Sequence, residues 1–125
     1  MHKTVKAFWD LIDSKNFEKL DSIYSESAVI HLPNTREAFT VKNYIKFNSL
    51  YPGNWRVNHI SDLNQRNKVI TVVTVTDGET THTCVAFFTL KDDLIVDQIE
   101  YWGENGEAPE WRKDLSYKEG QTWNL

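Results

Sequence analysis

Four consecutive segments rich in β-branched and aromatic residues constrain this fold most. They cover residues 55–63, 68–76, 80–90 and 94–102, and a polar turn of a few residues joins each to the next. Turns this short connect neighbouring antiparallel strands, because the chain has no room to cross over. The second half of the chain therefore predicts four consecutive antiparallel strands.

The first half of the chain has helical spacing instead. Val5, Phe8, Trp9 and Ile12 form one apolar stripe at i, i+3, i+4 and i+7, which predicts a helix over about 3–13. The same spacing predicts a second helix over about 16–25 and a third from Thr40 to just before Tyr51, with a short strand at 28–32 between them. The order of elements is typical of an α+β fold.

Composition limits the size and the partners of this fold. The 125 residues suit one domain, 1–125, with a core at about 3–112 and a polar tail at 113–125. The net charge is -4 and the sequence has no run of Lys or Arg, so we expect no nucleic-acid partner. No segment approaches the roughly 18 apolar residues of a membrane span, and the lone Cys84 cannot form an internal disulfide. We expect a cytoplasmic protein that does not enter membranes.

Both faces of the predicted sheet are substantially apolar. In the segment 68–76, Val69, Val73 and Val75 alternate with Ile70 and Val72. Three short helices cover only one face of such a sheet, so the other face needs a different cover. We therefore expect a homodimer, in which a second subunit covers the outer sheet face.

Three segments together resemble the nuclear transport factor 2-like superfamily, in its SnoaL-like branch of polyketide cyclase and ketosteroid isomerase relatives. They are Ala28-Val29-Ile30-His31-Leu32-Pro33, Tyr51-Pro52-Gly53-Asn54-Trp55 and Ile99-Glu100-Tyr101-Trp102-Gly103-Glu104. The resemblance implies a cystatin-like cone, in which a strongly bent antiparallel sheet wraps around the N-terminal helices. Its open end would be a ligand pocket, and its outer face a common site of dimerisation.

The resemblance also allows the catalytic residues of related enzymes to be compared with the residues of this chain. Where the ketosteroid isomerases carry a catalytic aspartate, an oxyanion-binding tyrosine and a protonated aspartate, this chain has Leu32, Phe8 and Ala86. These side chains supply neither a base to remove a proton nor a hydrogen-bond donor to stabilise the enolate, so we expect no ketosteroid isomerisation. The segment 80–90 contains no Arg or Asp, which disfavours the Asp-Arg-Asp chemistry of the related epoxide hydrolases.

Glu100 and His82 are the candidate catalytic residues. Alternation alone allows either face, but the resemblance places Gln98, Glu100 and Trp102 on the concave face. A three-residue turn at 91–93 would set residue 84 opposite 100 and 86 opposite 98, with His82 diagonal to Glu100. Partial burial would then raise the pKa of Glu100 towards neutral pH, where a carboxyl group can act as a general acid or base. In this hypothesis His82 could orient Glu100 or act itself. Alternatively, Glu100 is ion-paired, lies at the pocket rim or faces solvent, and His82 only satisfies a local hydrogen bond.

The candidate ligand-binding residues are mostly aromatic. They are Phe8, Trp9, Leu32, Tyr44, Trp55, His59, Cys84, Ala86, Gln98 and Trp102. His59 enters this set because it falls on the same face of its strand as Val57 and Trp55. Cys84 is interpreted as a small buried hydrophobe rather than a nucleophile, and His31 as structural or interfacial. The loop at 34–37 is interpreted as solvent-exposed, although Asn34 or Arg36 could touch a polar ligand group.

No cofactor or metal is expected. The histidines have no HxH or HExxH spacing, and no nucleotide-binding or GxSxG motif occurs. Two functions remain open. One is a cofactor-independent isomerase, cyclase or dehydratase acting on a small apolar molecule through a carboxylate. The other is a non-catalytic ligand-binding or dimeric accessory module of the same fold.

Overall fold

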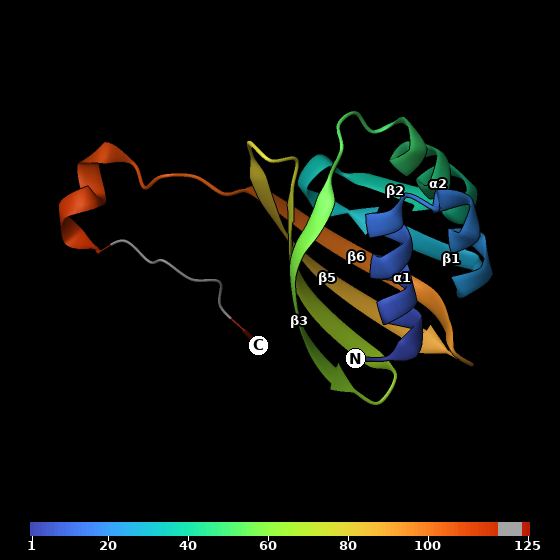
Figure 1. Cartoon of the computed structure of the whole chain (residues 1–125). Helices are drawn as coiled ribbons and strands as arrows, with labels where there is room; N and C mark the ends of the chain where they lie inside the picture. Colours follow the sequence, from blue (N-terminus) through green and yellow to red (C-terminus); the bar gives the residue numbers. More distant parts are fainter. Residues whose placement is uncertain (118–123) are drawn as a thin grey trace.

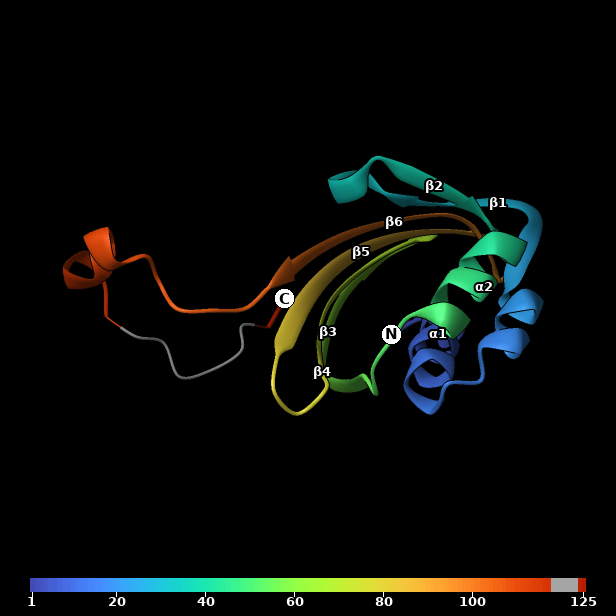
Figure 2. The same ribbon diagram turned by 90° about the horizontal axis from the view of Figure 1, so that it is seen from above.

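In the computed structural model, which describes residues 1–117 and 124–125, one curved six-stranded sheet wraps around two α-helices (Figures 1 and 2). The strands lie in the order β2-β1-β6-β5-β4-β3. The elements are α1 (Lys3–Ser14), η1 (Phe17–Ile23), β1 (Tyr24–Leu32), η2 (Pro33–Thr35), β2 (Glu37–Thr40), α2 (Val41–Leu50), β3 (Arg56–Gln65), β4 (Lys68–Thr76), β5 (Thr81–Lys91), β6 (Leu94–Glu104) and η3 (Glu110–Leu115). Helices α1 and α2 lie on the concave side of the sheet, as Figure 2 shows.

The four predicted antiparallel strands correspond to β3–β6, which pair in sequence order. The expectation of a wholly antiparallel sheet is wrong in one place, because β1 runs parallel to β6. Residues 33–93 separate β1 from β6, so no tight hairpin fixes their relative direction. The cone is therefore a mixed sheet.

The segments around β1 also depart from the predictions. The second predicted helix is the 3-10 helix η1, and β1 begins at Tyr24 instead of residue 28. Strand β2 lies in the segment interpreted as a loop, and it pairs with β1. Its four residues are too few, and mostly too exposed, to give a readable alternation. Together β2 and β1 form one edge of the sheet.

The turn between β5 and β6 is shorter than expected. Lys91 pairs with Leu94, so the turn consists of Asp92 and Asp93, which have left-handed φ angles of 52° and 63°. A bulge after Thr89 then sets Ala86 opposite Glu100. The turn is thus one residue shorter than predicted, and with the bulge the register differs from the prediction by two residues. A shift of two leaves each side chain on its predicted face, because strand side chains alternate with period 2.

The core lies between α1, α2 and the concave face of the sheet. Phe8 is at its centre, with ring contacts to Trp9, Tyr24, Tyr44 and Phe88 at centroid distances of 4.9–6.5 Å. The convex face is different, since Val29, Phe87 and Tyr101 are 36–45% exposed there. The sheet therefore has one covered face and one partly bare apolar face.

Beyond β6 the chain leaves the cone (Figure 1). In this segment η3 carries Trp111 and Leu115, which are 77% and 81% exposed. The predicted tail, 113–125, falls partly outside the described residues, including Trp123. Among the described residues, no helix has the length and apolar character needed to cross a membrane.

Candidate functional site

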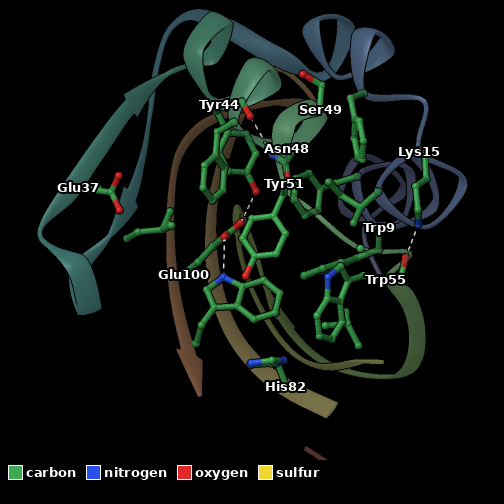
Figure 3. Close-up of a pocket in the computed structure, with 18 of the residues that line it drawn as sticks. Trp9, Lys15, Glu37, Tyr44, Asn48, Ser49, Tyr51, Trp55, His82 and Glu100 are labelled. Atoms are coloured by element: carbon green, nitrogen blue, oxygen red, sulfur yellow. Dashed lines mark hydrogen bonds between the residues drawn. The ribbon is translucent and has the colours of Figure 1, made fainter. Parts of the chain in front are cut away.

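A cavity of about 560 Å³ opens between the helices and the concave face of the sheet (Figure 3). Its surface is mainly apolar, although eight of the twenty lining residues are aromatic and eight carry polar or charged side chains. The lining residues are Phe8, Trp9, Ile12, Lys15, Phe17, Leu32, Asn34, Thr35, Glu37, Tyr44, Phe47, Asn48, Ser49, Tyr51, Gly53, Trp55, Val75, His82, Glu100 and Trp102. This size and composition are typical of small-molecule sites.

Most of the residues predicted for the site lie in this wall. The wall includes eight of them: Phe8, Trp9, Leu32, Tyr44, Trp55, His82, Glu100 and Trp102. Cys84, Ala86 and Gln98 belong to the same inner side of the sheet but are fully buried, outside the lining. They support the wall instead of forming its surface.

His59 is misplaced by the sequence analysis. Val57 pairs with Val75, but His59 pairs with Thr74, because the register shifts at a bulge between them. One extra residue reverses the alternation, so His59 no longer shares a face with Val57. Its imidazole lies 3.0 Å from Oδ1 of Asn124, and it is not part of the cavity wall.

Glu100 is buried at the cavity wall, with 2% of its surface exposed. Three donors reach its carboxylate. Oε2 accepts from the Tyr44 hydroxyl at 2.5 Å and from the Gln98 amide at 2.6 Å, and Oε1 accepts from the Trp102 indole at 2.9 Å. In the described structure no basic side chain pairs with it. The alternatives of an ion-paired or solvent-facing Glu100 are therefore contradicted.

The surroundings of Glu100 change its acidity. Burial raises the pKa of this carboxyl above the ordinary value, and the hydrogen bonds from Tyr44, Trp102 and Gln98 lower it in part. Burial penalises the charged form because the interior solvates it poorly, whereas each donor stabilises that form. A carboxylate whose pKa is raised in this way is a stronger base than an exposed glutamate.

The groups around Glu100 are neutral at physiological pH. Burial, together with the charge of Glu100, raises the pKa of Tyr24, Tyr44 and Cys84 well above their ordinary values. A thiol in that state is a poor nucleophile. This agrees with the interpretation of Cys84 as a buried hydrophobe.

His82 does not orient Glu100. It pairs with Glu104 in the β5–β6 ladder, two residues beyond the predicted register. Its imidazole packs edge-on against Trp55 with the ring centroids 5.0 Å apart, and Figure 3 shows it away from Glu100. His82 therefore lines a different part of the same cavity, with no hydrogen bond to Glu100 among the described residues.

Several residues of the site were not predicted from the sequence, chiefly Lys15 and Tyr51. Lys15 ends α1 in a left-handed conformation, and its ammonium donates to the carbonyl of Trp55. Gly53, also in the lining, has φ 100°, and a Cβ there would lie 2.7 Å from Nε1 of Trp55. The Tyr51-Pro52-Gly53 turn was thus the available signal for this wall.

The loop after β1 belongs to the site as well. Oδ1 of Asn34 accepts from the backbone N–H of Trp102 at 2.9 Å, which fixes the loop beside β6. Asn34 lines the cavity, whereas Arg36 does not. Within the described part of the chain, the amide NH₂ group of Asn34 has no protein partner and so offers a donor to a ligand.

No group of three or more His, Cys, Asp or Glu side chains suited to a metal ion occurs in the described residues. His31 faces the opposite side of β1 from the cavity, where its ring lies 3.1 Å from Asp97. The site thus consists of one buried carboxylate with its donors, in an aromatic cavity.

A curled sheet around helices with such a cavity defines the cone class of small α+β proteins. The SnoaL-like domain family model matches residues 5–98, and the chain belongs to that family. A search of curated proteins finds no match.

Solved structures share this fold. A protein from Kribbella flavida DSM 17836, proposed to be a ketosteroid isomerase, is 23% identical with a TM-score of 0.83, covering 99% of this chain and 93% of that one. An NTF-2 like protein of unknown function from Burkholderia xenovorans LB400 is 21% identical with a TM-score of 0.75, covering 94% of each chain. IdmH from Streptomyces antibioticus, proposed to be a polyketide cyclase, is 15% identical with a TM-score of 0.67, covering 82% and 89%. At these identities the likeness establishes the fold.

Proposed function

We propose that this chain binds a small, largely apolar organic molecule and that Glu100 is the general base in a cofactor-independent isomerisation, cyclisation or dehydration. The observation that carries the proposal is the buried carboxylate of Glu100 in the wall of an aromatic cavity. The related structures proposed to be isomerases and polyketide cyclases agree with this class of chemistry.

The hydrogen bonds of Glu100 indicate what its ligand must offer. A carboxylate has about four acceptor positions. Oε2 uses two of them, for Tyr44 and Gln98, and Oε1 uses one, for Trp102. One position on Oε1 remains among the described contacts, and because Glu100 lines the cavity we assign this position to a proton donor of the ligand. An acidic C–H, an enol or a phenol fits this requirement.

The rest of the cavity fits a flat molecule with a polar edge. Trp9, Trp55 and Trp102 provide broad apolar surfaces for a conjugated ring system. The amide of Asn34 and the hydroxyl of Tyr51 are donors for a ligand oxygen. Abstraction of a proton next to a carbonyl breaks the C–H bond, moves the proton to Oε1 and leaves the electron pair as an enolate, which such donors stabilise.

One observation favours the second candidate, a non-catalytic binding module. Phe8, Leu32 and Ala86 occupy the positions that carry the isomerase groups in the resemblance, and none has a polar side chain. In that case the cavity holds its ligand without turnover.

A proton-exchange assay separates the two candidates without knowledge of the natural substrate. The probe is 2-tetralone, a flat ketone with acidic C–H groups, in deuterium oxide, with exchange followed by proton NMR. We expect the wild-type protein to accelerate exchange above buffer, and E100Q to lose about 10²–10⁴-fold of that rate, the usual contribution of a general base.

The matched control is E104Q, which removes an exposed carboxylate from the same strand. It should exchange protons at the wild-type rate. If 2-tetralone binds to wild type and E100Q alike, as seen by thermal shift, and neither accelerates exchange, the catalytic proposal fails and the binding module stands. If no probe of this class binds at all, both candidates fail.

We also propose that the chain forms a homodimer through its outer sheet face in the cytoplasm. Val29, Phe87 and Tyr101 are exposed on that face, and the rings of Phe87 and Tyr101 pack edge-on at 6.3 Å. Exposed aromatic residues grouped on one sheet face are typical of an interaction surface. Fractionation of cells tests the location, and the oligomeric state tests the dimer.

A further inference from the structure

A buried chain of hydrogen bonds continues from Glu100 away from the cavity. The amide Nε2 of Gln98 donates to Glu100, and the amide Oε1 of Gln98 accepts from the Tyr24 hydroxyl at 2.6 Å. Gln98 is fully buried and Tyr24 is 5% exposed, and neither lines the cavity. The Tyr24 hydroxyl therefore reaches the carboxylate through the amide of Gln98, without touching a ligand.

The amide of Gln98 has two unlike ends, so its orientation matters to Glu100. With the NH₂ end towards Glu100, the amide donates to the carboxylate and favours its ionised form. With the carbonyl end towards Glu100, two acceptors would face each other unless the carboxyl carried a proton. The same side chain thus supports a base in one orientation and an acid in the other.

Tyr24 selects between these orientations. Among the described residues, Gln98 Oε1 is the acceptor of the Tyr24 hydroxyl proton. If the amide turned over, this proton would lose its acceptor in a buried site, which is costly. The present orientation also places the NH₂ group 3.5 Å from the Tyr44 hydroxyl. The observed arrangement is the one that satisfies every donor.

We infer that Tyr24 is a positioning residue, which holds the NH₂ end of Gln98 towards Glu100 and so keeps Glu100 as an ionised proton acceptor. The importance of Tyr24 for catalysis rests on the proposed function, but its effect on the protonation of Glu100 does not. Sequence spacing gives no hint of this role, because Tyr24 and Gln98 are 74 residues apart.

Other titratable groups near Glu100 do not take over the role proposed for Tyr24. Tyr44 from α2 and Cys84 from β5 face it, and both remain neutral. Lys15, Glu37 and His82 line the same cavity, but none forms an ion pair or hydrogen bond with Glu100 within the described part of the chain. The polar contacts of Glu100 come from Tyr44, Gln98 and Trp102.

Carbon-13 NMR of the glutamate side-chain carboxyls tests the inference directly. The Glu100 signal is assigned by its absence in E100Q, and its midpoint is measured by pH titration. We expect Y24F to raise the midpoint by about one pH unit, because the amide then supports the protonated form. The matched control Y101F removes a hydroxyl from the outer face and should leave the midpoint unchanged.

A second variant shows whether Tyr24 acts through Gln98. Q98L removes the amide and should itself raise the midpoint. Adding Y24F to Q98L should change nothing further, since coupled residues are not additive. An unchanged midpoint in Y24F, or an equal shift in both backgrounds, overturns the inference.

The wild-type protein provides a test that needs no variant to fold. Nuclear Overhauser contacts of the Gln98 amide protons should reach the Tyr44 ring. Contacts to the Tyr24 ring instead would show the reversed amide and overturn the inference. In the 2-tetralone assay, the pH dependence of exchange should shift in Y24F by the same amount as the NMR midpoint. Absent exchange with a shifted midpoint would reject the proposed function and leave the role of Tyr24 intact.

Discussion

At the residue scale, Glu100 is held between two opposing effects. Burial disfavours its charge, while Tyr44, Trp102 and Gln98 stabilise it, and the net result is a raised pKa. The unfolded chain gives Glu100 an ordinary pKa, so the unfolded state releases this proton first as the pH rises. Ionised Glu100 is therefore a cost to the folded state.

The sign of this effect gives a prediction for E100Q. The stability contributed by protonated Glu100 is fully present below the ordinary glutamate pKa, and it is lost as the pH rises through the raised pKa of the folded state. The free energy of unfolding of wild type minus that of E100Q should therefore fall across this interval and then level off. Urea unfolding at several pH values measures it. A difference that is constant with pH, or that rises, contradicts the assignment.

At the scale of one element, the β3–β4 hairpin carries backbone strain. Gln65 pairs with Lys68, which leaves Arg66 and Asn67 as the turn, and Arg66 has φ 54°. A left-handed conformation costs a residue with a Cβ roughly 1–2 kcal/mol, and glycine avoids that cost. Arg66 is exposed, so its side chain has little packing to lose.

We therefore expect R66G to stabilise the protein by up to about 1 kcal/mol, after the entropy of a more flexible unfolded chain is subtracted. The midpoint of urea unfolding measures the change. R66A is the matched control, because it removes the side chain but keeps the Cβ. Equal stability of R66G and R66A would show that the turn is not strained.

At the scale of the whole molecule, the cone covers one face of its sheet and leaves the other partly bare. Phe87 and Tyr101 lie on adjacent strands of this outer face, 39% and 45% exposed. A charge placed there has no effect on the buried side of the sheet, but it would be desolvated in a dimer.

F87E should therefore convert the proposed homodimer to a monomer while the fold persists. Sedimentation velocity gives the oligomeric state, and circular dichroism gives the fold. T89E is the matched control, since it adds the same charge to the same face of β5. It should weaken the dimer less than F87E if the contact is centred on the aromatic pair. A wild-type monomer at all concentrations would refute the dimer.

The succession of strands and the faces on which their residues lie follow from the amino-acid pattern alone. Alternation with period 2 depends on each strand alone, so Glu100, Ala86 and Cys84 share one face even though the predicted turn was too long. The apolar stripe of Phe8 and Trp9 likewise fixed the buried side of α1. Where a bulge added a residue, at His59, this local rule failed.

The surroundings of Glu100, in contrast, depend on how distant parts of the chain pack together. Tyr44 lies 56 residues away in sequence and reaches Glu100 from α2. Tyr24 is linked through Gln98 across 74 residues, and the parallel pairing of β1 with β6 brings Tyr24 to Gln98. Such contacts depend on how helices and strands pack, because no local spacing relates them. The strand pattern could place a carboxylate on the concave face, but only packing surrounded it with donors and, in the described part of the chain, without a cation.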